Sequence, residues 1–199
     1  MRLEHLEAHL NELLHDLNSP LSSMRLQLGL LREELRTNPQ LLKRVEVTER
    51  QVLRSQSMIE AFARACRVKQ GEAPGGEVVR RVFERFGIEV SDDSGDAKVA
   101  VAPKTLDLIV RSLAEGCVGL MEDGSRFARV AAKEGTFVIR VDGRFDQKVL
   151  ARALRLSFTG ETGEPRLALA MTRVAASASN GTLLLEPNAL VLRLPLVAE

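Results

Sequence analysis

Residues 10–21 read Leu-Asn-Glu-Leu-Leu-His-Asp-Leu-Asn-Ser-Pro-Leu, in the middle of a long leucine-rich segment. Leucines at positions 3, 6, 10, 13 and 17 follow steps of three and four residues, the spacing of one face of an α-helix. The same face continues through Leu17, Leu21, Met24, Leu28, Leu31 and Leu35. This segment therefore predicts one long amphipathic helix that carries His15 and Pro20.

A second helix is expected after Arg36-Thr37-Asn38-Pro39, where Asn38 can cap the helix and Pro39 can take its first position. Its inward positions again alternate steps of four and three: Leu41, Val45, Thr48, Val52, Ser55, Ile59, Phe62 and Cys66. Together the two helices predict a long antiparallel hairpin over residues 2–68. Because a lone hairpin leaves apolar stripes in water, we expect two hairpins to pair as a four-helix bundle in a homodimer.

The pattern changes after residues 70–76, which have the composition of a linker. Helices are expected at 77–86, 103–120, near 146–156 and at 166–179. Strands are expected at 88–91, 98–101, 127–132, 136–141, 182–186 and 189–195, and a loop at 159–165. Strands followed by covering helices predict a sheet with helices on one face. The expected fold class is α+β, with a helical hairpin domain over 1–70 and an α/β sandwich domain over 77–199.

Composition argues against several classes of function. Lys and Arg number 28 and Asp and Glu 27, and neither Trp nor Tyr is present, which disfavours nucleic-acid binding. No apolar stretch reaches the length of a membrane span. Cys66 and Cys117 have neither disulfide nor metal-site spacing. We therefore expect a soluble cytoplasmic protein that has no sensor segment and binds neither nucleic acid nor membrane.

His15 is the strongest candidate for chemistry. With Leu10 and Leu13 in the seam of the bundle, His15 falls on the solvent-facing side of its helix. There its imidazole can act as a nucleophile toward a partner's active site. Asp16 can orient the ring or handle a proton, and Ser19, one turn further on, can contact a phosphoryl group or a water.

Ser22 and Ser23 extend this small, polar face along the helix, and we predict that a partner binds over Ser19, Ser22 and Ser23. His5 and His9 lie one turn apart, a spacing that can hold a metal on a helix face. No third ligand is apparent, so no metal site is expected.

The run His15-Asp16-Leu17-Asn18-Ser19-Pro20-Leu21 resembles the H-box of sensor histidine kinases. The usual form of that motif is His, an acid, Leu, Arg, Thr, Pro and Leu, so Asn18 and Ser19 are mild departures. The resemblance implies that residues 2–68 form a dimerisation and histidine-phosphotransfer (DHp) domain with His15 as phosphoacceptor. It also implies that residues 77–199 correspond, in element order, to the catalytic ATP-binding (CA) domain of such kinases.

The motifs with which that family binds ATP are altered. Gly116 stands where the magnesium-binding Asn is expected. The adenine turn reads Val141-Asp142-Gly143-Arg144-Phe145, in which Asp142 is plausible but the glycine spacing is lost. The phosphate stretch, residues 164–170, has Glu164, Arg166 and Ala168 at its glycine positions. Because backbone must approach the nucleotide closely there, we expect a degenerate domain that does not bind ATP.

A dimeric phosphotransfer hairpin with a degenerate ATP-binding domain resembles the histidine phosphotransferases of bacterial phosphorelays, of the ChpT type. The resemblance implies that His15 shuttles a phosphoryl group between the aspartates of receiver domains. The implied partners are response-regulator receiver domains or a hybrid histidine kinase. No cofactor of its own is implied, because the receiver supplies the magnesium.

Three alternatives remain open. The chain could be a pseudokinase or adaptor that is never phosphorylated, although the intact His15-Asp16 pair favours transfer. It could be a response-regulator phosphatase in which Ser19 positions a water, although Thr or Asn is usual there. It could also be a divergent active kinase, against which the three altered motifs count.

Overall fold

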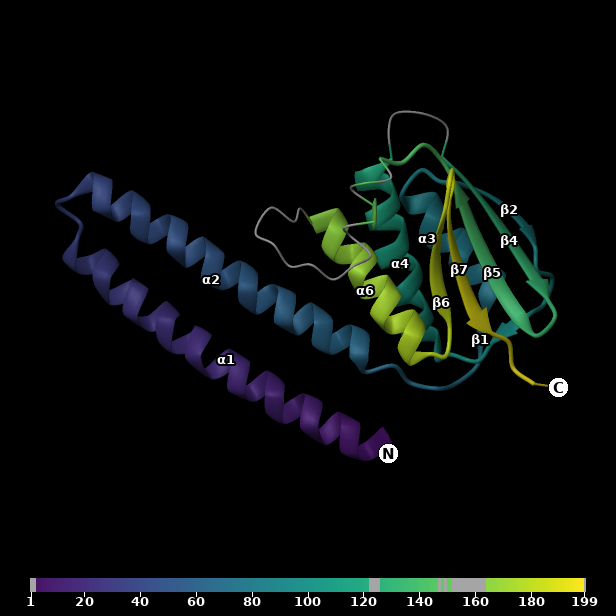
Figure 1. Cartoon of the computed structure of the whole chain (residues 1–199), viewed down its shortest axis with the longest axis horizontal. Helices are drawn as coiled ribbons and strands as arrows, with labels where there is room; N and C mark the ends of the chain where they lie inside the picture. The colour runs from purple at the N-terminus through teal and green to yellow at the C-terminus, as the bar shows by residue number, and fades with distance from the viewer. Residues whose placement is uncertain (1–2, 122–125, 147, 149, 152–163, 199) are drawn as a thin grey trace. The chain divides into compact units, whose positions relative to one another are not determined.

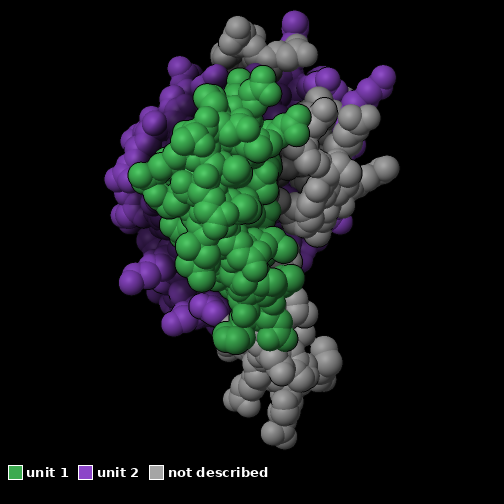
Figure 2. Space-filling model, turned by 90° about the vertical axis from the view of Figure 1, so that its left-hand side faces the viewer, with its two compact units in different colours: residues 1–64 green, residues 65–199 purple. Residues whose placement is uncertain are grey.

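A computed structural model describes residues 3–121, 126–146, 148, 150–151 and 164–198. Contacts divide the chain into two compact units, Met1–Arg64 and Ala65–Glu199 (Figure 2). Each unit is described by itself.

The first unit consists of helix α1 (Leu3–Glu34) and helix α2 (Pro39–Cys66), which run antiparallel and side by side (Figure 1). The backbone N–H of Leu41 donates to Asn38 Oδ1 at 3.3 Å, so Asn38 caps α2 and Pro39 begins it, as its sequence predicts. Along the pair, Gln56 Nε2 donates to Ser22 Oγ at 3.4 Å. The helices agree with the leucine periodicity; their pairing into a four-helix bundle stays a prediction.

Apolar side chains of the hairpin differ widely in burial. Leu14, Val45 and Val52 are buried. Many others remain exposed: Leu17, Met24, Leu26, Leu30, Leu31, Leu41, Val47 and Leu53. Single exposed leucines are normal on a monomeric protein, but the hairpin exposes a larger number of apolar side chains than that.

The second unit is built on a five-stranded sheet of order β2-β4-β5-β7-β6. Its strands are β2 (Glu89–Asp93), β4 (Phe127–Lys133), β5 (Thr136–Asp142), β6 (Thr182–Glu186) and β7 (Ala189–Pro195). Among the described strand pairs of this sheet, only β2–β4 is parallel. Helices α3 (Gly75–Arg85), α4 (Pro103–Leu120) and α6 (Glu164–Ala178) cover one face (Figure 1). The expected α+β class and the one-sided helical layer are confirmed.

Side-chain alternation explains which face of the sheet the helices cover. In β5, Phe137, Ile139 and Val141 are fully buried. The alternate residues Arg140 and Asp142 are only partly buried, so they lie on the other face of the sheet. The β4–β5 turn places Glu134 and Gly135 at positive φ, 49° and 72°, which suits a tight hairpin. The core thus lies between the sheet and the three helices.

Residues 70–76, expected as a linker, are instead partly structured. Ala73–Pro74 forms strand β1, which pairs with β3 (Lys98–Val99), and α3 begins at Gly75. A Cβ on Gly75 would lie 2.6 Å from Cζ of the Phe137 ring. The glycine there permits close packing rather than flexibility. The helix expected near 146–156 and the loop at 159–165 fall largely outside the described residues.

Candidate functional site

His15 and Asp16 lie near the middle of α1. Their side chains are 84% and 76% exposed, and His15 Nδ1 lies 3.6 Å from Asp16 Oδ1. The imidazole is therefore open to a partner, as its position opposite the leucine seam predicts. A carboxylate beside Nδ1 favours the tautomer in which Nε2 is free to act as a nucleophile.

Ser19 and Ser22 follow His15 along the same side of α1, since steps of four and three residues return to one helix face. Both are exposed, as is Ser23. Ser22 also accepts the hydrogen bond from Gln56, so this face of α1 borders α2. The three serines are thus accessible, and their role in partner binding remains a prediction.

Two residues on this side of α1 were missed by sequence reasoning. Leu26 and Leu30 are 68% and 59% exposed, the most exposed large apolar side chains among the described residues. The signal was available, because both leucines fall outside the heptad register of the seam. Leucines that no seam explains are candidates for a contact with another protein.

In the second unit, the place expected for a magnesium-binding side chain is filled. Gly116 of α4 is buried, and a Cβ there would lie 2.5 Å from Leu169 Cδ2 and 3.2 Å from the Leu169 backbone N. Leu169, in α6, is fully buried. No larger side chain fits between the helices at Gly116 unless α6 moves.

The adenine turn is altered in a similar way. Met121 lies against Gly143, with its Sδ 3.3 Å from where a Cβ would stand. Phe145 is 7% exposed and forms an isolated β-bridge with Met121. The space beside Gly143 in this turn is thus filled by other side chains of the protein.

Asp142, the acidic residue of this turn, is bonded to arginines on the sheet surface. Alternation along β5 turns it to the sheet face that the helices do not cover, opposite Val141. There Asp142 Oδ2 accepts from Arg129 Nη2 at 2.8 Å, and Asp142 Oδ1 accepts from Arg140 Nε at 2.8 Å. Arg140 also pairs with Glu186. Asp142 therefore belongs to a surface ion-pair network.

This network shifts the titration of its members. Partial burial raises the pKa of the Asp142 carboxyl, but hydrogen bonds from Arg129 and Arg140 outweigh it and hold the pKa below its ordinary value. Hydrogen bonds to Glu186 and Asp142 raise the pKa of the Arg140 guanidinium. Both groups stay charged near neutral pH.

The expected phosphate stretch, residues 164–170, forms the start of α6 rather than a glycine-rich loop. Ala168 and Ala170 are buried. The side chains of Glu164 and Arg166 lie outside the described part of the structure, as do those of His5 and His9. Among described residues, no group of three His, Cys, Asp or Glu side chains could hold a metal ion.

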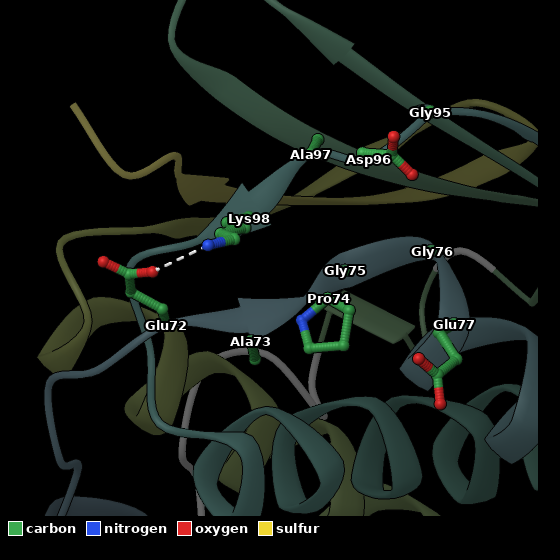
Figure 3. A pocket seen from close by; sticks show the side chains of 10 residues that line it. All are labelled: Glu72, Ala73, Pro74, Gly75, Gly76, Glu77, Gly95, Asp96, Ala97 and Lys98. Carbon is green, nitrogen blue, oxygen red and sulfur yellow. Dashed lines mark hydrogen bonds and ion pairs between the residues drawn. The ribbon is translucent and has the colours of Figure 1, made fainter. Parts of the chain in front are cut away.

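A pocket of about 480 Å³ lies elsewhere in the second unit, around the first turn of α3 (Figure 3). Glu72, Glu77 and Asp96 line it together with Lys98, whose Nζ lies 3.2 Å from Glu72 Oε2. A helix N-terminus attracts anions, whereas three carboxylates repel them. The lining therefore selects no class of ligand.

Comparisons with protein-family models and with curated proteins find no match. Among solved structures, full-length ShkA in complex with AMPPNP superposes with a TM-score of 0.56 at 18% identity, covering 96% of this chain. The chain spans 47% of the length of ShkA. The histidine kinase AdeS of Acinetobacter baumannii matches with a TM-score of 0.53 at 12% identity, covering 92% of this chain and 98% of AdeS.

The nucleotide-free catalytic domain of histidine kinase ThkA matches with a TM-score of 0.51 at 14% identity, covering 64% of this chain and 95% of that domain. The fold is histidine-kinase-like. No helix within the described residues is long and apolar enough to cross a membrane.

Proposed function

We propose that this chain is a cytoplasmic phosphorelay histidine phosphotransferase that acts through His15 as a homodimer and without binding ATP. One combination of features carries the proposal. His15 and Asp16 are exposed on a long helix of a histidine-kinase-like fold. In the same chain, Leu169 occupies the space beside Gly116, where a magnesium-binding side chain is expected. A phosphoacceptor that cannot be loaded by its own domain must be loaded by another protein. The ChpT-type phosphotransferases are the class with this combination.

The chemistry requires little of the chain beyond position. His15 Nε2 attacks the phosphorus of an aspartyl phosphate on a receiver domain, the P–N bond forms, and the P–O bond to the aspartate breaks. The receiver's carboxylate leaves with the electron pair, and Asp16 stabilises the proton held on Nδ1. Transfer to a second receiver reverses these steps. The receiver would hold the magnesium that neutralises the transferring phosphoryl group, so this chain contributes orientation.

Ser19 lies one turn from His15 on the same exposed side, within reach of a phosphoryl group or a water at the imidazole. The side chains of Ser22 and Ser23 are short, so they leave room for a partner element to approach the α1 backbone closely. Receiver domains of response regulators, or of a hybrid histidine kinase, are the partners that fit this chemistry.

The test supplies two phosphoryl donors in turn. The protein is incubated with γ-labelled ATP and magnesium, and separately with labelled phosphorylated receiver domains from the same genome. We expect label only from a receiver, lost in His15→Ala and kept in the matched variant His9→Ala. Label from ATP alone would identify an active kinase, and binding of a receiver without label would identify an adaptor.

A further inference from the structure

Strand β6 forms one border of the described sheet and is apolar for an edge strand (Figure 1). It reads Thr-Leu-Leu-Leu-Glu, and among the described strands it pairs with β7 alone. Leu184, 41% exposed, is the one exposed large apolar side chain among the described residues of the second unit. Proteins usually protect edge strands with charges, proline or bulges, because unpaired backbone groups bind other strands. In β6, only the terminal Glu186 supplies a charge.

The opposite border of the sheet, strand β2, is protected. Its sequence, Glu-Val-Ser-Asp-Asp, carries three carboxylates. If two copies of β2 paired antiparallel about Ser91, Glu89 of one copy would face Asp93 of the other. Like charges directly opposite each other destabilise a strand pair. The two edges of the sheet therefore differ, because β2 resists pairing and β6 does not.

The turn between β6 and β7 determines which backbone groups of β6 point outward. A turn of two residues joins the strands, so Glu186 and Ala189 are its closing, hydrogen-bonded pair. Along an antiparallel strand, every second residue bonds to the same neighbour. The N–H and C=O groups of Leu183 and Leu185 therefore point away from β7, toward the open edge of the described sheet.

A second copy of β6 fits this edge in a symmetric register. When the strands run antiparallel and Leu184 faces its own counterpart, Leu183 of each copy exchanges backbone hydrogen bonds with Leu185 of the other. Thr182 then faces Glu186 of the second copy, so like charges do not meet. A two-fold axis through Leu184 also keeps the helices of both copies on the same face of the joined sheet.

Helix α6 extends this apolar edge on the covered face of the sheet. It packs on β6 and β7, α3 packs on β2, and α4 lies between the two helices, so α6 borders the same edge as β6. Leu169 faces α4, because a Cβ on Gly116 would lie 2.5 Å from its Cδ2. Met171 and Val174 lie about 200° and 140° around α6 from Leu169, on the side away from α4. Both are half-buried, as is Leu185, and a copy paired through β6 would cover them.

An arginine on the uncovered face of the sheet is placed to bind the second copy. The side chain of Arg193, in β7, is exposed and has no ion-pair partner among the described residues. Arg193 is level with Thr182, which would face Glu186 of the second copy. One strand would separate the two charges. Arg140 of β5 already pairs with Glu186 of its own chain across one strand, β7, so an arginine side chain spans that gap.

We propose that β6 and the outer side of α6 form a self-association surface, at which a second copy of the chain extends the sheet through an antiparallel β6–β6 pair centred on Leu184. The proposal does not depend on phosphoryl transfer. One short strand and part of a helix make a small interface, which is typical of weak, transient association. Because its residues are not those of the leucine-rich face of the hairpin, this surface joins hairpin dimers into larger assemblies when the protein is concentrated.

Disulfide trapping on the full chain tests the register. Each variant also carries Cys66→Ser, and Cys117 is buried, so the engineered cysteine supplies the reactive thiol. Leu184→Cys places two thiols directly opposite each other, with Cα atoms about 4.5 Å apart, a separation that a disulfide spans. Thr182→Cys is a control on the same strand, because the two copies of that residue would be about 14 Å apart. Ser91→Cys, in the middle of β2, is the control for the protected edge.

With oxidised glutathione, we expect Leu184→Cys to form a disulfide-linked dimer about tenfold faster than either control. In sedimentation velocity, the mass of the wild type should rise above that of the hairpin dimer as its concentration increases. Leu184→Asp should stay at the mass of the hairpin dimer, with an unchanged Tm. Equal crosslinking rates in the three cysteine variants would overturn the proposal and leave β6 to a strand of another protein. A wild-type mass that does not change with concentration would overturn it as well.

Discussion

Because Gly116 packs closely against Leu169, we expect Gly116→Ala to lower the stability of the second unit, whereas the same change in most helices raises stability. In a helix interior, Ala is normally more favourable than Gly by about 0.8–1.0 kcal/mol. Here the new Cβ would stand 2.5 Å from Leu169 Cδ2 and 3.2 Å from the Leu169 backbone N, and Leu169 is fully buried. Overpacking of a core costs about 1–3 kcal/mol. The two effects combine to a net loss of up to about 2 kcal/mol in the free energy of unfolding of the second unit.

Differential scanning calorimetry on the full chain measures this effect without an aromatic fluorophore, which matters because Trp and Tyr are absent. A loss of up to about 2 kcal/mol should lower Tm of the second unit by up to about 8 °C. Gly29→Ala is the matched control, because Gly29 is also helical but its Cβ would have nothing within 4 Å. That variant should be stabilised by up to about 1 kcal/mol.

A double-mutant cycle tests whether Leu169 is the cause. Leu169→Ala alone should cost about 2–5 kcal/mol. In the Gly116→Ala background it should cost about 1–2 kcal/mol less, since the new methyl group then has room. If Gly116→Ala raised Tm as Gly29→Ala does, the close packing of α4 on α6 would be refuted. The structural argument against a nucleotide there would fall with it.

Three further predictions follow from other contacts. Millimolar AMPPNP with magnesium should leave Tm unchanged in calorimetry, whereas a nucleotide-binding domain would be stabilised by mass action. Because the folded-state pKa of Asp142 is lowered, its stabilisation is fully present at neutral pH and is lost progressively as the pH falls below about 4, so Asp142→Asn should destabilise the chain more at pH 7 than at pH 3. Met24→Glu should shift the sedimentation coefficient from that of a dimer toward that of a monomer, because Met24 is half exposed on the leucine-rich face that is expected to pair two hairpins. An unchanged dimer would contradict that pairing.

Much of the local structure was predictable from sequence because it depends on short-range periodicity. Leucine spacing located α1 and α2, and Pro103 marked the start of α4. Alternation and turn residues located β5, β6 and β7 within a residue or so. Residues 73–76 were misjudged, because glycine and proline suggest a linker when their packing partners, such as Phe137, cannot be seen.

For the candidate site, the sequence was enough to predict that His15 stands beside Asp16 on the solvent side of a long helix, since helix geometry links residues only a few positions apart. Tertiary structure decided the rest. Gly116 and Leu169 pack against each other, although their helices α4 and α6 are far apart in the chain. Asp142 accepts hydrogen bonds from Arg129 on the neighbouring strand and from Arg140 on its own strand. Such contacts depend on how elements pack, which local periodicity does not specify.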